Sequence, residues 1–206
     1  MNEIRLLIVD DHAIVRTGLV ALLESDGRVS VIGEADDGNA ALALVRKLKP
    51  DIVIMDILMP GMDGIAATQE IKEKFPGTKV LILTTSTASD ELAAALAAGA
   101  DGAITKSTAN ATLLSAVKDI AAGKRVISPE ISKLIANDPP VKALTERQRI
   151  ILEAMAQGKG NKEIAAQLGL QTDSVRQHVI AILSKLGATN RAEAVAIALR
   201  KHLLKM

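Results

Sequence analysis

Four short aliphatic runs in the first half of the chain are each followed by residues that could take part in chemistry. An acidic pair, Asp10 and Asp11, follows the first run, and Asp56, Thr84 and Lys106 follow the other three. Clustered carboxylates repel one another at neutral pH and therefore need a cation. Oxygen ligands favour Mg²⁺, while a lysine ammonium and a threonine hydroxyl can both bind a phosphoryl oxygen. A carboxylate nucleophile beside Mg²⁺ and a lysine has the equipment to form an aspartyl-phosphate.

These side chains can meet only if the aliphatic runs are strands of one sheet. Continuous apolar runs are typical of parallel strands buried on both faces, and the candidates are Ile4–Val9, Val29–Ile32, Ile52–Met55, Lys79–Leu83 and Gly102–Ile104. Helical stretches with one apolar stripe follow them, at Ala13–Glu24, Gly38–Leu48, Gly64–Lys74, Asp90–Ala98 and Thr108–Ala122. This alternation predicts an α/β domain with a doubly wound, five-stranded parallel sheet. Because ligands bind at the carboxyl ends of strands in such sheets, the polar residues should converge there.

The net charge changes sign between the two halves of the chain. Residues 1–120 carry a net charge of −6 and residues 121–206 a net charge of +7, so the second half is the candidate for binding a polyanion. Between them, Pro139 and Pro140 cannot continue a helix and stiffen the chain. We therefore predict a first domain over residues 1–122, a linker over 123–141 that contains a short helix, and a second domain over 142–206.

The second half is predicted to be a small all-α domain of four helices. Thr145 opens the first helix with capping-box spacing, and Asn161 is expected to cap a second helix that ends at Leu168. A turn that begins at Gly169 leads into the third helix, and Asn190 opens the fourth. Two helices joined by a short turn containing glycine are typical of a helix-turn-helix motif.

The third of these helices, Thr172 to about Leu186, has a polar face that suits base reading. Arg176 can bond guanine and Gln177 adenine in the major groove, and Ile180 can contact a thymine methyl group. Ile180 can equally be a singly exposed apolar residue, which is common on protein surfaces. Lys185 lies on the flank, where it would contact a phosphate or pack against the domain.

Composition excludes several other functions. The chain has no cysteine, which excludes a disulfide framework and a thiol nucleophile. Phe75 is the only aromatic residue, so base stacking of the kind used by single-strand binders is excluded. No apolar stretch reaches the roughly 18 residues of a membrane span, and the N-terminus lacks the features of a secretion signal. We therefore expect no membrane partner.

Residues 1–122 resemble the receiver domain of two-component systems. The resemblance rests on the acidic pair, Asp56 with MPGMDG at residues 59–64, Thr84 and Lys106. It implies that Asp56 accepts a phosphoryl group from a histidine kinase, and that Thr84 and Lys106 bind this group. It also implies that Asp11 and Asp56 bind Mg²⁺ directly, that Asp10 acts through water, and that Leu58 offers its backbone carbonyl.

Residues 142–200 resemble the LuxR-type helix-turn-helix domain. The matching segments are LTER at 144–147, GKGNKEIA at 158–165, VRQHV at 175–179 and LSKLG at 183–187. A receiver followed by this domain is the arrangement of the NarL/FixJ response regulators. It implies a cytoplasmic, non-enzymatic transcription regulator that forms a homodimer when phosphorylated and binds double-stranded DNA. In that family the fourth helix often mediates dimerisation, and the residues here that would form that face, or else close the domain core, are Ala194, Val195, Ile197 and Ala198.

One departure from the receiver pattern keeps other functions open. Ala103 stands where receivers usually have Tyr or Phe, so either Thr84 alone drives the switch or the coupling is weaker. A phosphate-independent DNA-binding regulator is therefore one alternative. A Mg²⁺-dependent aspartyl-phosphate phosphohydrolase is another, but such enzymes usually need a proton-transferring carboxylate two residues after the nucleophile, where Leu58 stands.

Overall fold

The chain forms two compact units, which are described separately below. The structure is a computed structural model, and it describes residues 3–108, 110–141, 144–201 and 203–204. The first unit spans Met1–Pro139 and the second spans Pro140–Met206. None of the helices in the described part of the chain combines the length and apolarity needed to cross a bilayer.

The first unit is built on a parallel sheet with strand order β2-β1-β3-β4-β5-β6. Each neighbouring pair of strands in this order is parallel, as the sequence predicts. The described strands are β1 (Ile4–Val9), β2 (Val29–Ala35), β3 (Ile52–Met55), β4 (Lys79–Thr84), β5 (Gly102–Thr105) and β6 (Val126–Ile127). The order reverses direction after β1, which is the doubly wound arrangement.

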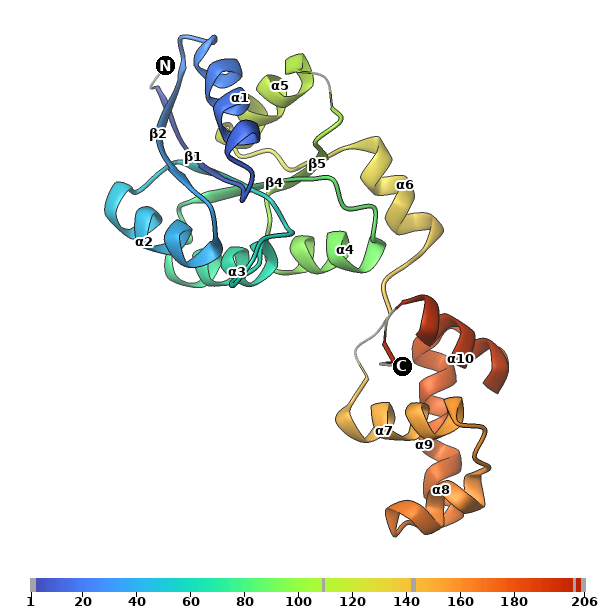
Figure 1. Ribbon diagram of the computed structural model, residues 1–206. Coiled ribbons are helices and arrows are strands. Elements are labelled where there is room, and N and C mark those ends of the chain that lie inside the picture. The colour runs from blue at the N-terminus through green and yellow to red at the C-terminus, as the bar shows by residue number, and fades with distance from the viewer. Residues whose placement is uncertain (1–2, 109, 142–143, 202, 205–206) are drawn as a thin grey trace. The chain divides into compact units, whose positions relative to one another are not determined.

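Helices cover both faces of this sheet (Figure 1). They are α1 (Ala13–Glu24), α2 (Gly38–Leu48), α3 (Gly64–Lys74), α4 (Ser89–Ala97) and α5 (Asn110–Ala121). Helices α1 and α5 pack on one face and α2, α3 and α4 on the other. Successive strand residues alternate between the two cores: Leu6 and Ile8 join the α1–α5 side, whereas Leu7 and Val9 join the other. Burial on both faces is why the strands read as continuous aliphatic runs.

The segment that the sequence assigns to a linker differs from expectation. Val126 and Ile127 pair with Gly102 and Ala103, so the sheet has six strands, whereas the sequence predicted five. Helix α6 (Pro129–Asn137) then packs on α4 and β5. A two-residue edge strand is too short to produce a periodic sequence signal, and its existence depends on the neighbouring strand. Residues 126–138 thus pack with the first unit.

The second unit contains α7 (Glu146–Ala156), α8 (Asn161–Leu168), α9 (Thr172–Leu186) and α10 (Arg191–Arg200). Its aliphatic core draws on all of them, with Leu152, Ile164, Val175 and Ile182 deeply buried. Thr145 and Gln148 form the expected capping box at the start of α7, and the side chain of Asn190 caps α10. Helix α8 begins one position earlier than predicted, because the N-cap is Gly160 and Asn161 is already helical.

Gly64 allows α3 to start directly against the end of β3. A Cβ atom at this position would lie 1.8 Å from the carbonyl oxygen of Asp56. Its N–H donates to the carbonyl of Ile57 over 3.0 Å, so the close approach also closes the loop by a hydrogen bond. The position of Asp56 therefore depends on a residue without a side chain eight positions later.

We expect Gly64→Ala to lower the free energy of unfolding by about 3 kcal/mol, because the backbone must move to accept the methyl group. Urea denaturation followed by circular dichroism measures this change, since the chain has no tryptophan. Gly77→Ala is the matched control, because a Cβ there would meet nothing within 4 Å. An equal loss of stability in both variants would contradict this account of Gly64.

Candidate functional site

The polar residues that follow the strands converge at one edge of the sheet, as predicted. Asp10 follows β1, Asp56 follows β3, Thr84 ends β4 and Lys106 follows β5. The Lys106 ammonium bridges two carboxylates: its Nζ lies 2.5 Å from Asp10 Oδ2 and 2.5 Å from Asp56 Oδ2. Both carboxylates are buried, so the lysine supplies the positive charge that they need.

Backbone groups fix the orientation of Asp56. Its N–H donates to the carbonyl of Val9 over 2.9 Å, which extends the β1–β3 pairing to this residue. Its Oδ1 accepts from the N–H of Ile57 over 2.7 Å. One carboxylate oxygen is thereby held by the backbone, and the other, Oδ2, faces Lys106.

Lys106 remains charged in this environment. Burial alone would lower the pKa of its ammonium, but hydrogen bonds to Asp10 and Asp56 and their negative charges outweigh burial and raise the pKa. The backbone also places this residue, since its N–H donates to the carbonyl of Thr84 over 2.9 Å. The cation is thus held in the correct place for an anionic group on Asp56.

Thr84 is fully buried beside this pair. Its hydroxyl oxygen accepts from the N–H of Ser86 over 3.1 Å. The Ser86 hydroxyl in turn donates to Glu91 Oε2 over 2.5 Å, which links the end of β4 to α4. Sequence reasoning identified Thr84 but missed Ser86 and Glu91, because their contact depends on how the loop before α4 folds.

The acidic pair at the end of β1 offers ligands for a metal ion. Carboxylate oxygens of Asp10 and Asp11 and a ring nitrogen of His12 all lie within 4.8 Å of one another. His12 is the N-cap residue of α1, and its Nδ1 lies 2.7 Å from Asp11 Oδ1. Two carboxylates at the end of a strand, with Asp56 beside them, fit a hard divalent cation such as Mg²⁺.

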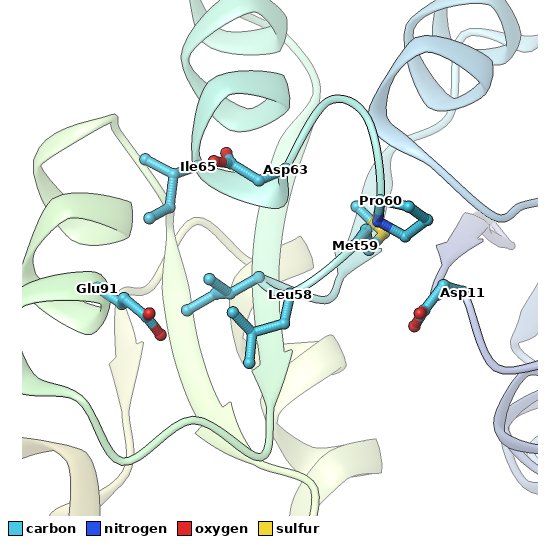
Figure 2. A pocket seen from close by; sticks show the side chains of 8 residues that line it. Asp11, Leu58, Met59, Pro60, Asp63, Ile65 and Glu91 are labelled. Atoms are coloured by element: carbon cyan, nitrogen blue, oxygen red, sulfur yellow. The ribbon is translucent and has the colours of Figure 1, made fainter.

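A pocket of about 400 Å³ opens next to this cluster. Figure 2 shows Asp11 on one side, Glu91 on the other and Leu58 between them. The remaining lining residues are Ile57, Met59, Pro60, Asp63 and Ile65, from the loop that follows Asp56 and the start of α3. The pocket therefore opens beside Asp11 and the loop that follows Asp56, and its three charged lining residues are all carboxylates.

In the second unit, helix α9 presents the polar face that the sequence predicts. Arg176 and Gln177 are exposed, and Ile180 is 54% exposed although it is a large apolar residue. Arg176 lies 3.6 Å from Asp173 at the start of the same helix. Lys185 is turned inward, where its Nζ donates to Gln148 Oε1 over 2.8 Å and joins α9 to α7.

The fourth helix of this unit, α10, differs from one of the two expectations. Ala194 and Ala198 are 0% exposed and belong to the domain core, so neither has surface to offer a partner. Val195 and Ile197 are partly buried against the same core. The alternative, that this stripe closes the core, describes the packing, because small residues let α10 approach α9 and α7 closely.

Comparison with protein families assigns both units. Residues 6–118 match the response regulator receiver domain. Residues 142–198 match the luxR family of bacterial regulatory proteins. The two matches lie on either side of the prolines that separate the units, and together they account for most of the chain.

Relatives of full length show the same arrangement. The response regulator protein VraR of Staphylococcus aureus strain Mu3 is 38% identical over 207 residues, which cover 98% of this chain and 99% of that protein. The crystal structure of the response regulator ChrA from a heme-sensing two-component system is 35% identical, with a TM-score of 0.60, and the match covers 99% of this chain and 100% of that chain. A structure of two RcsB dimers bound to two parallel DNAs is 28% identical, with a TM-score of 0.69, and covers 97% of this chain and 99% of that chain. The chain therefore belongs to the LuxR family of two-component response regulators, in which a receiver domain precedes a helix-turn-helix domain.

Proposed function

We propose that Asp56 is the phosphoacceptor through which a histidine kinase controls DNA binding by this transcription regulator. The observation that carries the proposal is the bridge from Lys106 to the buried carboxylates of Asp10 and Asp56. In the proposed step, Asp56 Oδ2 attacks the phosphorus of a phosphohistidine, the N–P bond breaks, and the imidazole leaves. Lys106 and the Thr84 hydroxyl then bind oxygens of the phosphoryl group.

Mg²⁺ is the proposed cofactor of this site. Asp11 and Asp56 would hold it directly, Asp10 through water, and Leu58 through its backbone carbonyl. When bound, Mg²⁺ neutralises charge on the phosphoryl group. The carboxylate cluster at the end of β1 and the position of Leu58 in the same pocket as Asp11 support this assignment.

The residue two positions after Asp56 is not a carboxylic acid, which favours a signalling role over turnover. Leu58, two residues after the phosphoacceptor, lines the pocket and is half exposed. A leucine cannot transfer a proton to a leaving group or activate a water molecule. We therefore propose that the acyl phosphate is a long-lived signal and that the protein is not an enzyme.

We propose that α9 reads DNA in the major groove through Arg176, Gln177 and Ile180, with Lys185 on its flank. Their exposure on one face supports this role. For Lys185, the bond to Gln148 indicates that it supports the packing of α9 as well. RcsB, a similar protein, is known as dimers bound to DNA, which supports a homodimer of this chain on two half-sites when phosphorylated. A DNA target also implies a cytoplasmic location.

We expect Asp56→Asn to abolish phosphorylation by a small phosphodonor such as acetyl phosphate, because the amide is not a nucleophile. Intact-mass spectrometry of the protein incubated with Mg²⁺ measures the adduct directly. Asp37→Asn is the matched control: the carboxylate of Asp37 caps α2 by accepting from the N–H of Ala40, and asparagine caps equally well. An adduct that survives in Asp56→Asn would assign the phosphoacceptor to another residue.

Removal of the metal is expected to have the same effect as loss of its ligands. EDTA should prevent adduct formation, and saturating Mg²⁺ should stabilise the wild-type protein by about 3 kcal/mol at a hundred times its dissociation constant. Asp11→Asn should lose most of this stabilisation in thermal denaturation. Asp37→Asn changes the N-cap of α2 and should respond to Mg²⁺ as the wild type does; an equal response of Asp11→Asn would contradict the assignment.

Replacing thymine by deoxyuridine tests the role of Ile180 at the level of one methyl group. In a duplex selected by the protein from a random pool, this replacement at the contacted position should weaken wild-type binding by about 1 kcal/mol. Binding by Ile180→Ala should not respond to the same replacement of thymine. Both changes remove the same contact, so their effects should not add in a double-mutant cycle. Ile14→Ala, an exposed isoleucine of the first unit, is the control. If no thymine position distinguishes the two proteins, Ile180 is only an exposed apolar residue.

A further inference from the structure

Helix α6 packs on α4 and β5, the two elements that lie next to Thr84 and Lys106 in the chain and that a change at the phosphorylated site would reach first. Ile131 is fully buried and belongs to the same core cluster as Ala103. Leu134 and Ile135 pack against that cluster, and the N–H of Ser128 donates to the carbonyl of Ala103 over 3.0 Å. Figure 1 shows α6 beside α4 at this edge of the sheet. The helix is therefore part of the receiver core in this state.

A hydrogen bond joins the end of α6 to the start of α4. The Ser89 hydroxyl donates to Asp138 Oδ2 over 2.8 Å. Asp138 is the C-cap residue of α6, where a negative charge is unfavourable for its own helix. The same carboxylate lies at the N-terminus of α4, where a negative charge is favourable and where the N-cap residue, Ala88, makes no side-chain cap. The position of this charge therefore favours the docked position of α6 on α4.

A continuous set of hydrogen bonds leads from Thr84 to this contact. Ser86 donates its N–H to the Thr84 hydroxyl, and its own hydroxyl accepts from the N–H of Ala88 over 3.1 Å. Ala88 precedes Ser89, the first residue of α4. Any movement of Thr84 toward a phosphoryl group on Asp56 therefore changes the support of the residue that holds Asp138.

We propose that α6 is a latch, formed by Ile131, Asp138 and their partners on α4 and β5, which phosphorylation of Asp56 opens. This inference rests on the proposed function. Thr84 moves to the phosphoryl group, the start of α4 shifts, and the Ser89–Asp138 bond breaks. With the helix docked, the tether to the second unit begins at Pro139 and is stiffened by two prolines. Undocking of α6 extends the tether back to Ser128, the residue after β6, and widens the range of positions that the DNA-binding unit can reach. Because Ala103 is buried and stands where receivers usually have an aromatic ring, the conformational change is passed on by α6 and not by such a ring.

Amide hydrogen exchange of the full-length protein tests the latch without knowledge of the operator. With acetyl phosphate and Mg²⁺, and with the adduct verified by intact mass, peptides covering residues 128–138 should exchange about 5- to 150-fold faster. Ser89→Ala and Asp138→Ala should show faster exchange in the same peptides without phosphodonor. Ser132→Ala, an exposed serine of α6, is the matched control and should behave as the wild type.

Cross-linking provides the second arm. Because the chain has no cysteine, a Ser89→Cys, Asp138→Cys protein can be joined at one place by a short bismaleimide. The cross-linked protein should still form the adduct, but its binding to a random duplex DNA pool should not rise on phosphorylation, whereas that of the wild-type protein should. Unchanged exchange of α6 in phosphorylated wild-type protein, or an equal rise in DNA binding with the cross-link in place, would overturn the latch. Failure to form any adduct would instead overturn the proposed phosphoacceptor.

Discussion

The ammonium of Lys106, held between Asp10 and Asp56, is the interaction on which the rest of the receiver depends. Two buried carboxylates repel each other, and the cation between them offsets that repulsion. The strand order places β4 between β3 and β5. The side chain of Lys106, which follows β5, must therefore reach past the end of β4 to Asp56, and neighbouring strands are about 4.8 Å apart. A lysine has the long, flexible side chain that this distance needs. The sheet thus holds the charges of Asp10, Asp56 and Lys106 at separations that depend on the spacing of its strands.

The same edge of the sheet connects the chemistry to the output. Thr84 lies between the charged residues because it ends β4, and its hydroxyl is bonded to the loop that leads into α4. From there the contacts continue to α6 through Ser89. Since an isolated hydrogen bond contributes only about 1 kcal/mol, a chain of such bonds is suited to a signal that must be reversible.

Both units have aliphatic cores, but the cores are arranged differently. The receiver buries both faces of its sheet. The strands are therefore fixed, and the charged residues at their ends are held in place. The second unit has one small core, and one face of α9, with Arg176, Gln177 and Ile180, stays exposed. The opposite charges of the two halves of the chain correspond to this division: the acidic half holds the proposed sites for Mg²⁺ and a phosphoryl group, and the basic half suits a polyanion.

Local pattern in the sequence determined five of the six strands of the described sheet, the main helices and the convergence of Asp10, Asp56, Thr84 and Lys106, because parallel strands must bring their carboxyl ends together. It also separated the exposed from the buried face of α9. Contacts between distant segments decided the remainder. Strand β6 is two residues long and forms only beside β5, and α6 joins the core because Ile131 finds an apolar surface there. Ala194 and Ala198 face inward because α9 and α7 lie on that side, and the links from Ser86 to Glu91 and from Ser89 to Asp138 depend on loop paths. Periodicity reports which face of an element is apolar, but only the tertiary structure decides which neighbour covers it.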